Sequence, residues 1–207
     1  MRLPRRLAGL ALVQILIMMK TKMAKRKPEK RAAKMAAFES LKAGFEARVI
    51  PVLQEVEFER SVFSSHHFGG DNREPTYTFI SLQEKDLLDL IYFQIRSDEL
   101  CIKVYYNRIK FSDGPRRVDE FQGRTGLSLL LMPVRKTEKE IHRWLPIPFL
   151  KIPRSYVVTD VRSVKAAEEA SEKTIAELCG DLMNFDIIRA EWDAEHDPVE
   201  VEFATLA

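Results

Sequence analysis

The 207-residue chain has few residues of the kinds that mark specialised protein classes. Only two cysteines are present, Cys101 and Cys179. Two are too few for a disulfide scaffold, so we expect both to be reduced side chains in the core of a cytoplasmic protein. Eight glycines and ten prolines are too few for a low-complexity linker. Hydrophobic residues make up 45% and charged residues 31% of the chain, which is typical of a globular domain with a core.

The familiar catalytic motifs are also missing. The sequence contains no glycine-rich phosphate loop of the Walker or dinucleotide type, and no serine in a strand-to-helix elbow. It contains no paired-cysteine zinc signature and no His-Glu metalloprotease helix. We therefore expect no cofactor and no metal, and we do not expect an enzyme of the motif-bearing classes.

Charge is distributed very unevenly along the chain. Residues 1–34 carry 11 Lys and Arg against one acid, Glu29, a net charge of +10. Residues 35–160 carry 18 of each sign, and residues 161–207 carry 4 basic and 12 acidic side chains, a net charge of −8. Without its first 34 residues the chain is acidic, which argues against nucleic acid as a partner, because phosphate binding needs basic charge held on a surface.

Residues 1–34 are interpreted as a basic N-terminal extension, either disordered or included by a misplaced start. The true start would then be Met19, Met23 or Met35. Residues 7–19 are uncharged, but a membrane span needs about 20 apolar residues and no small-residue cleavage site follows them. The alternatives are an amphipathic arm lying on a surface, and a genuine export signal or membrane anchor at residues 7–19.

Residues 35–207 are predicted to form a single α+β domain. An antiparallel meander sheet of about five to seven strands would pack against an N-terminal and a C-terminal helix. Helical spacing of apolar residues runs from Arg31 to Leu53, with a kink or break expected near Pro51. It runs again from the capping residue Ser163 to about Asp193, with Gly180 as a possible end. Strands are predicted at residues 56–63, 76–82, 88–96, 100–107, 127–134, 156–161 and 199–203, and a short helix at 137–144.

The best catalytic candidate is the loop that contains His66, His67 and Asp71. Imidazole and carboxylate groups can bind metal or act as general acids and bases. Adjacent residues of an extended segment point apart, however, and no partnered nucleophile is visible in the sequence. A hydrolase-like enzyme that uses this loop is therefore retained as an alternative to the main hypothesis.

A second cluster is basic and follows two aromatic residues, Tyr105 and Tyr106. Basic groups beside aromatic rings resemble a single-stranded nucleic acid surface. Three acids lie among them, which favours a solvated loop with internal ion pairs. The basic members are Arg108, Lys110, Arg116, Arg117 and Arg124. RNA binding through this loop and the basic arm is the second alternative.

The acidic C-terminal region supplies the leading hypothesis. Its carboxylates include Glu191, Glu195 and Asp197, which a basic partner would recognise by charge complementarity. We expect a non-catalytic protein-binding or regulatory module of a bacterial-type cytosolic protein. Its possible partner-binding residues are those three acids together with Arg116 and Arg117.

Overall fold

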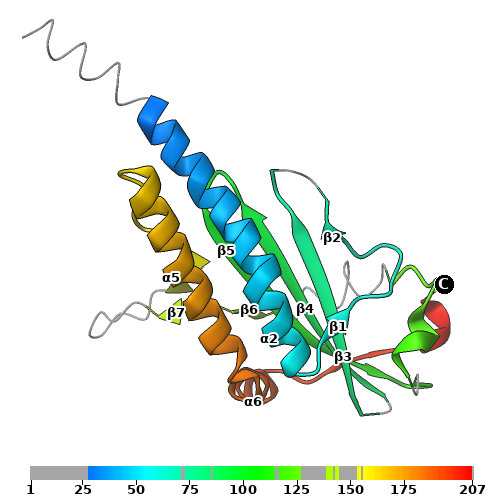
Figure 1. Ribbon diagram of the computed structural model, residues 1–207. Helices are drawn as coiled ribbons and strands as arrows, with labels where there is room; N and C mark the ends of the chain where they lie inside the picture. Colours follow the sequence, from blue (N-terminus) through cyan, green and yellow to red (C-terminus); the bar gives the residue numbers. More distant parts are fainter. Residues whose placement is uncertain are drawn as a thin grey trace, which may run out of the picture.

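The computed structural model describes residues 28–70, 73–84, 86–114, 117–126, 139–141, 143–144, 153–154 and 156–206. The fold is α+β, as the sequence predicts. Two long helices lie side by side on one face of a sheet, and a third, shorter helix crosses one end of it (Figure 1). Among the described residues no helix is long and apolar enough to cross a membrane.

The N-terminal helix occupies residues 28–55 in three consecutive stretches. Residues 28–44 are α-helical, Phe45–Val49 (η1) form a π-helical segment, and Ile50–Glu55 (α2) return to α-helix. Pro51 has no N–H to give to the preceding turn, and the Ile50 N–H bonds back to the Phe45 carbonyl. The expected break is thus replaced by a wider turn. The helix also includes part of the expected extension, since Ala33 is buried in the core.

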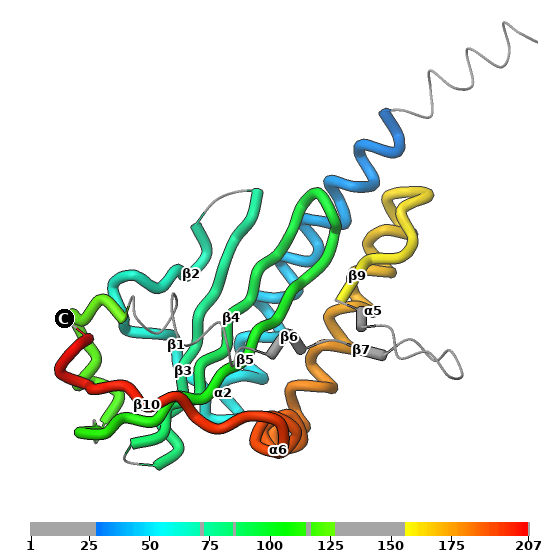
Figure 2. The backbone as a smooth tube through the Cα atoms, turned by 180° about the vertical axis from the view of Figure 1, so that it is seen from behind, coloured from blue at the N-terminus to red at the C-terminus, as the bar shows by residue number. Residues whose placement is uncertain are grey.

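The sheet is a meander of three long strands with short strands along its edges. The long strands β3, β4 and β5 are joined by tight turns and pair antiparallel, as predicted. In the described chain the strands are β1 (Glu59–Arg60), β2 (Phe68–Gly69), β3 (Thr76–Glu84), β4 (Leu87–Arg96), β5 (Cys101–Phe111), β6 (Lys139–Ile141), β7 (Arg143–Trp144), β8 (Pro153–Arg154), β9 (Tyr156–Val157) and β10 (Val199–Val201). β10 pairs with β5 in parallel (Figure 2), which is an exception to the antiparallel meander.

Two sequence-based predictions are wrong. The strand expected at residues 56–63 shrinks to β1, because the helix continues to Glu55 and Glu57 turns the chain with a φ of 66°. The short helix expected at 137–144 is replaced by β6 and β7, where pairing of Ile141 with Val104 of β5 outweighs the local capping pattern. The strand expected at 127–134 lies outside the described residues.

The C-terminal helical region is divided in two. α5 (Val164–Leu182) begins at Ser163, whose Oγ accepts a hydrogen bond from the Ala166 N–H at 3.2 Å, as predicted. Gly180 lies inside α5, which ends two residues later at Leu182. The chain then turns at Met183 and Asn184 before the next helix begins. There the Asn184 amide donates to the Gly180 carbonyl at 2.8 Å. α6 (Phe185–Glu195) then crosses the end of the sheet (Figure 1).

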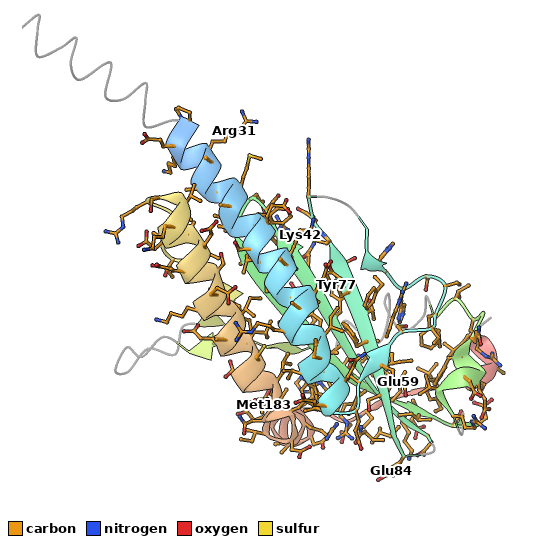
Figure 3. All side chains as sticks on the ribbon, in the orientation of Figure 1. Arg31, Lys42, Glu59, Tyr77, Glu84 and Met183 are labelled. Carbon is orange, nitrogen blue, oxygen red and sulfur yellow. The ribbon has the colours of Figure 1, made fainter. Side chains whose placement is uncertain are left out.

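The N-terminal helix and α5 run in the same direction and approach closely (Figure 1). The Ser171 hydroxyl donates to the Ala37 carbonyl at 3.1 Å. Further along, a Cβ added to Gly44 would lie 2.8 Å from Cγ1 of Ile175. Small residues at this interface allow the two backbones to come together. Tyr77 of β3 reaches the helix from the sheet and donates to Glu46 at 2.8 Å (Figure 3).

Apolar side chains cover both faces of the sheet, as the pattern of the third predicted strand indicates. The main core fills the space between the sheet and the helices and includes Ile91, Phe93 and Trp192. The second core lies on the opposite face, because its β4 members Leu88 and Leu90 alternate with Ile91. It is closed by two short 3₁₀ segments, η2 (Val118–Phe121) and η3 (Phe203–Thr205), and by the buried Leu206.

Candidate functional site

A buried charge network joins α6 to the sheet. Asp89 of β4 is fully buried, and its carboxylate accepts three hydrogen bonds of 2.9 Å. The donors are the Tyr106 hydroxyl, Nε of Arg108 and Nε of Arg189. Nη1 of Arg108 also binds the carboxylate of Asp193. All three partners of Asp89 donate, which is the arrangement that an ionised carboxylate accepts.

Opposite charges compensate one another in this network, which is consistent with a structural role in attaching α6 to the sheet. Burial raises the pKa of Asp89, while the guanidinium groups of Arg189 and Arg108 oppose that rise. Burial and the adjacent Asp89 also raise the pKa of Tyr106, so its hydroxyl remains a donor. The network's groups bind one another, and Arg189 and Asp193 both belong to α6. The bonds that Arg189 and Asp193 make therefore fix which side of α6 faces outward.

The outward side of α6 carries an apolar stripe. Ile187 is 60% exposed, and Met183, just before the helix, is 63% exposed. Met183 lies at the junction of α5 and α6 (Figure 3). Ala190 and Ala194 are also exposed and follow Ile187 at helical spacing. The opposite side of α6 buries Phe185 and Trp192, so the stripe points away from the core.

Acidic side chains border this stripe. Asp186, Glu191 and Glu195 are exposed on α6, and Asp197 is exposed just after the helix ends. Helical spacing places Asp186 on one flank of Ile187 and Glu191 on the other. The structure thus brings together the predicted acids of the region, Glu191, Glu195 and Asp197, beside apolar residues that the sequence analysis did not single out.

The predicted histidine loop contains one close polar pair. Nδ1 of His66 lies 2.6 Å from Oγ of Ser61. His67 is exposed and is not part of this pair, and its carbonyl accepts from the Thr78 N–H at 3.1 Å. Asp71 lies outside the described residues. The structure therefore gives His66 a serine partner that the sequence analysis did not identify.

Burial dominates the electrostatics of His66. Loss of solvent lowers the pKa of its imidazole to about 4, and the nearby His67 lowers it further, while the Gly126 backbone opposes the shift. Nε2 of His66 is buried and has no hydrogen-bond partner within 3.5 Å. The ring is consequently neutral at pH 7, with Nδ1 engaged by Ser61.

The basic cluster is dispersed in the structure. Arg108 and Tyr106 lie in the buried network. Arg117 is exposed and forms an ion pair of 3.2 Å with Asp119, whereas Arg116 lies outside the described residues. The guanidinium of Arg124 packs over the Phe203 ring at 3.9 Å. Burial thus withdraws Arg108 from the surface on which Arg117 is exposed.

Within the described ranges, no group of three or more His, Cys, Asp or Glu side chains is placed to hold a metal ion. Cys101 and Cys179 are both free and buried. The chain was compared with protein-family models, with curated proteins and with solved structures, and none of these matches it.

The sequence does contain a signal for the exposed apolar stripe, although the predicted core-facing pattern does not include it. The predicted stripe of the C-terminal helix leaves Met183 and Ile187 on the other side, four residues apart, so two large apolar residues fall together off the core face. By contrast, Asp89 and Arg189 are 100 residues apart. Nothing local in the sequence indicates that they meet.

Proposed function

We propose that this chain is a protein-binding module that docks a basic amphipathic helix on the outer face of α6. The exposure of Ile187 and Met183, at 60% and 63%, carries this proposal. Large apolar side chains that are exposed together and bordered by polar residues are typical of interaction sites. Because both cysteines are free and buried, we place this activity in the reducing cytoplasm.

The chemistry of the surface defines the partner. Apolar side chains at helical spacing, such as Ile187 and Ala194, complement a helix with its own anchors at positions i, i+3, i+4 and i+7. The flanking carboxylates would meet Lys or Arg side chains on that helix. Residues 161–207 carry a net charge of −8, so long-range attraction would speed association and make it sensitive to salt.

The buried network supports the proposal by holding the docking face in place. Arg189 and Asp193 bind the sheet side of α6, and Trp192 is fully buried beneath the helix. A surface that is already fixed loses little conformational entropy when a partner binds. We therefore expect binding without rearrangement of α6.

Site-specific photo-crosslinking in native lysate tests the proposal. A crosslinking residue is placed at Ile187 and, in a matched control, at Met35, which is exposed to a similar extent (61%) on the N-terminal helix. We expect a discrete adduct with one basic protein at position 187 but not at position 35. The yield of the adduct should fall as salt is raised from about 50 to about 500 mM, because ions screen the attraction between the two charged surfaces over this range.

Charge reversal provides the second arm. The double variant Glu195→Lys, Asp197→Lys should abolish the adduct at position 187, because two exposed carboxylates that would attract a basic partner become repulsive. A reversal of two exposed charges elsewhere, Glu168→Lys with Glu169→Lys on α5, should leave it unchanged. Identical adducts at positions 187 and 35, or an adduct that survives reversal beside α6, would overturn the proposal.

A further inference from the structure

Unpaired buried polar atoms collect around the loop between β1 and β2. Among the described residues, three buried side-chain polar atoms have no hydrogen-bond partner: Oγ of Ser65, Nε2 of His66 and Oγ1 of Thr78. Thr78 lies against this loop, because its backbone binds that of Ser61 at 3.0 Å and that of His67 at 3.1 Å. Buried polar groups are normally satisfied. Three exceptions in one place therefore single out this loop from the rest of the described chain.

The distance between Ser61 and His66 suits a nucleophile and its base. The Phe63 N–H donates to Oγ of Ser61 at 3.4 Å, so that oxygen already accepts one hydrogen bond. In the tautomer that carries the imidazole proton on Nε2, Nδ1 of His66 accepts the hydroxyl proton of Ser61, 2.6 Å away. A neutral imidazole nitrogen within hydrogen-bond reach of a serine hydroxyl is the arrangement that activates serine for attack.

The pair opens onto a surface cavity. The cavity has a volume of about 510 Å³ and is lined by Arg60, Ser61, Val62, Phe63, Ser64, His66 and Gln122. That volume suits a small organic molecule. Phe63 and Val62 supply apolar walls, and the Gln122 amide supplies N–H groups able to stabilise negative charge on an oxygen.

The loop is pinned in position by contacts with a second loop. The Ser64 N–H donates to the Arg124 carbonyl at 3.0 Å. The Phe63 ring lies against Phe121 and His66, with ring centres 4.9 and 4.8 Å apart. A Cβ added to Gly126 would lie 2.5 Å from the Phe63 ring. These contacts hold the imidazole beside Ser61 rather than leaving it in solvent.

We propose that Ser61 and His66 form a nucleophile–base pair that hydrolyses small uncharged carboxylic esters. Oγ of Ser61 attacks the carbonyl carbon, and its proton passes to Nδ1 of His66. The bond to the alcohol oxygen breaks, the alcohol takes the proton from His66, and an acyl group remains on Ser61. Water then attacks this acyl group, again through His66, releases the acid and restores Ser61.

Two assays on the full chain test the inference: turnover of p-nitrophenyl acetate, and labelling by a fluorophosphonate with the adduct mapped by mass spectrometry. We expect one adduct, on Ser61, and turnover above the background rate. Ser61→Ala should remove both. His66→Gln should slow both by about 100-fold or more, the usual contribution of a general base.

The controls are Ser112→Ala, which removes an exposed turn serine, and His67→Gln, which alters the exposed neighbouring ring. Both should keep the adduct and the turnover. Absence of an adduct on Ser61 of the unmodified chain, or an adduct on another residue, would overturn the inference. That result is independent of whether Ser61→Ala folds, and it does not touch the proposed docking role of α6.

Discussion

Asp89 and Arg108 stand directly opposite each other on β4 and β5, and Oδ1 of Asp89 lies 2.9 Å from Nε of Arg108. Further along the same face of the sheet the residues are apolar, beginning with Ile91 on β4. The pair is therefore a charged element inside the main core. Arg189 and Asp193 extend it to α6, so the position of that helix depends on charges that the sheet holds.

Loss of the Asp89 charge is expected to be costly. In Asp89→Asn, Arg108 and Arg189 would remain buried without their shared counter-charge, and we expect the free energy of unfolding to fall by about 3 kcal/mol. Urea denaturation measures this change. Asp186→Asn is the matched control: its carboxylate also binds Arg189, but its side chain is 93% exposed, and a change of less than about 1 kcal/mol is expected. Equal effects in the two variants would contradict a structural role for burial of the pair.

His66 should make stability depend on pH over an acidic window. Burial lowers its folded-state pKa from 6.5 to about 4. Above pH 6.5 the ring is neutral in both states, and the full stability is present. As pH falls from about 6.5 to about 4 the unfolded chain takes up a proton that the folded chain does not, and stability declines by at most about 3 kcal/mol.

Two measurements check the behaviour of His66. NMR titration should place its ring midpoint near pH 4, and denaturation curves at several pH values should lose part of their pH dependence in His66→Gln. A ring midpoint near 6.5 would show that the imidazole is not buried against Ser61 as described.

Both cysteines should resist modification in the folded state. Burial raises the pKa of the Cys101 thiol to about 12 and raises that of Cys179 as well, so little reactive thiolate is present at pH 8. We expect negligible reaction with iodoacetamide in buffer within about an hour. In about 6 M guanidinium, which unfolds most domains, both thiols should react completely. Mass spectrometry counts the adducts. Rapid labelling of either residue in buffer would contradict its burial.

The two helical glycines Gly44 and Gly180 should respond oppositely to alanine. Alanine favours the helix by about 1 kcal/mol over glycine at either position. At Gly44, however, the new Cβ would lie 2.8 Å from the branched Ile175 side chain. At Gly180 nothing lies within 4 Å. We expect Gly180→Ala to stabilise by about 0.5–1 kcal/mol and Gly44→Ala to destabilise by about 1–2 kcal/mol.

Thermal denaturation of the two glycine variants provides the measurement. A Gly44→Ala protein as stable as Gly180→Ala would mean that the N-terminal helix and α5 lie further apart than the structure places them. The double variant Gly44→Ala, Ile175→Ala separates the causes, because it removes the opposing side chain. The steric part of the Gly44→Ala effect should disappear in that background, although loss of the Ile175 side chain from the core carries its own cost of about 2–5 kcal/mol.

Local patterns predicted the elements whose stability is largely local. The alternation of Ile91, Phe93 and Ile95 located β4, and the hydroxyl of Ser163 located the start of α5. Predictions failed where distant partners decide the outcome. Residues 137–144 match a capped helix in sequence, yet Ile141 pairs with Val104 of β5.

The candidate sites divide in the same way. The acids Glu191 and Glu195 were visible as a charge excess in the sequence. Their apolar neighbour Ile187 was visible only as a departure from the core-facing stripe. Ser61 carried no signal at all, because its contact with His66 depends on how the loop turns after β1, and short loops without glycine or proline leave that turn undetermined by composition.

The parallel strand β10 has a consequence for how the chain is made. β10 lies beside Ile109, Lys110 and Phe111 of β5, and Leu206 fills a place in the second core. During translation the meander and its first helix emerge from the ribosome well before β10 and Leu206 do. The second core then stays incomplete until β10 and Leu206 have been made, and the nascent protein passes through a stage in which apolar side chains of this core are exposed. Stalled or shortened products would be natural targets for chaperones and proteases.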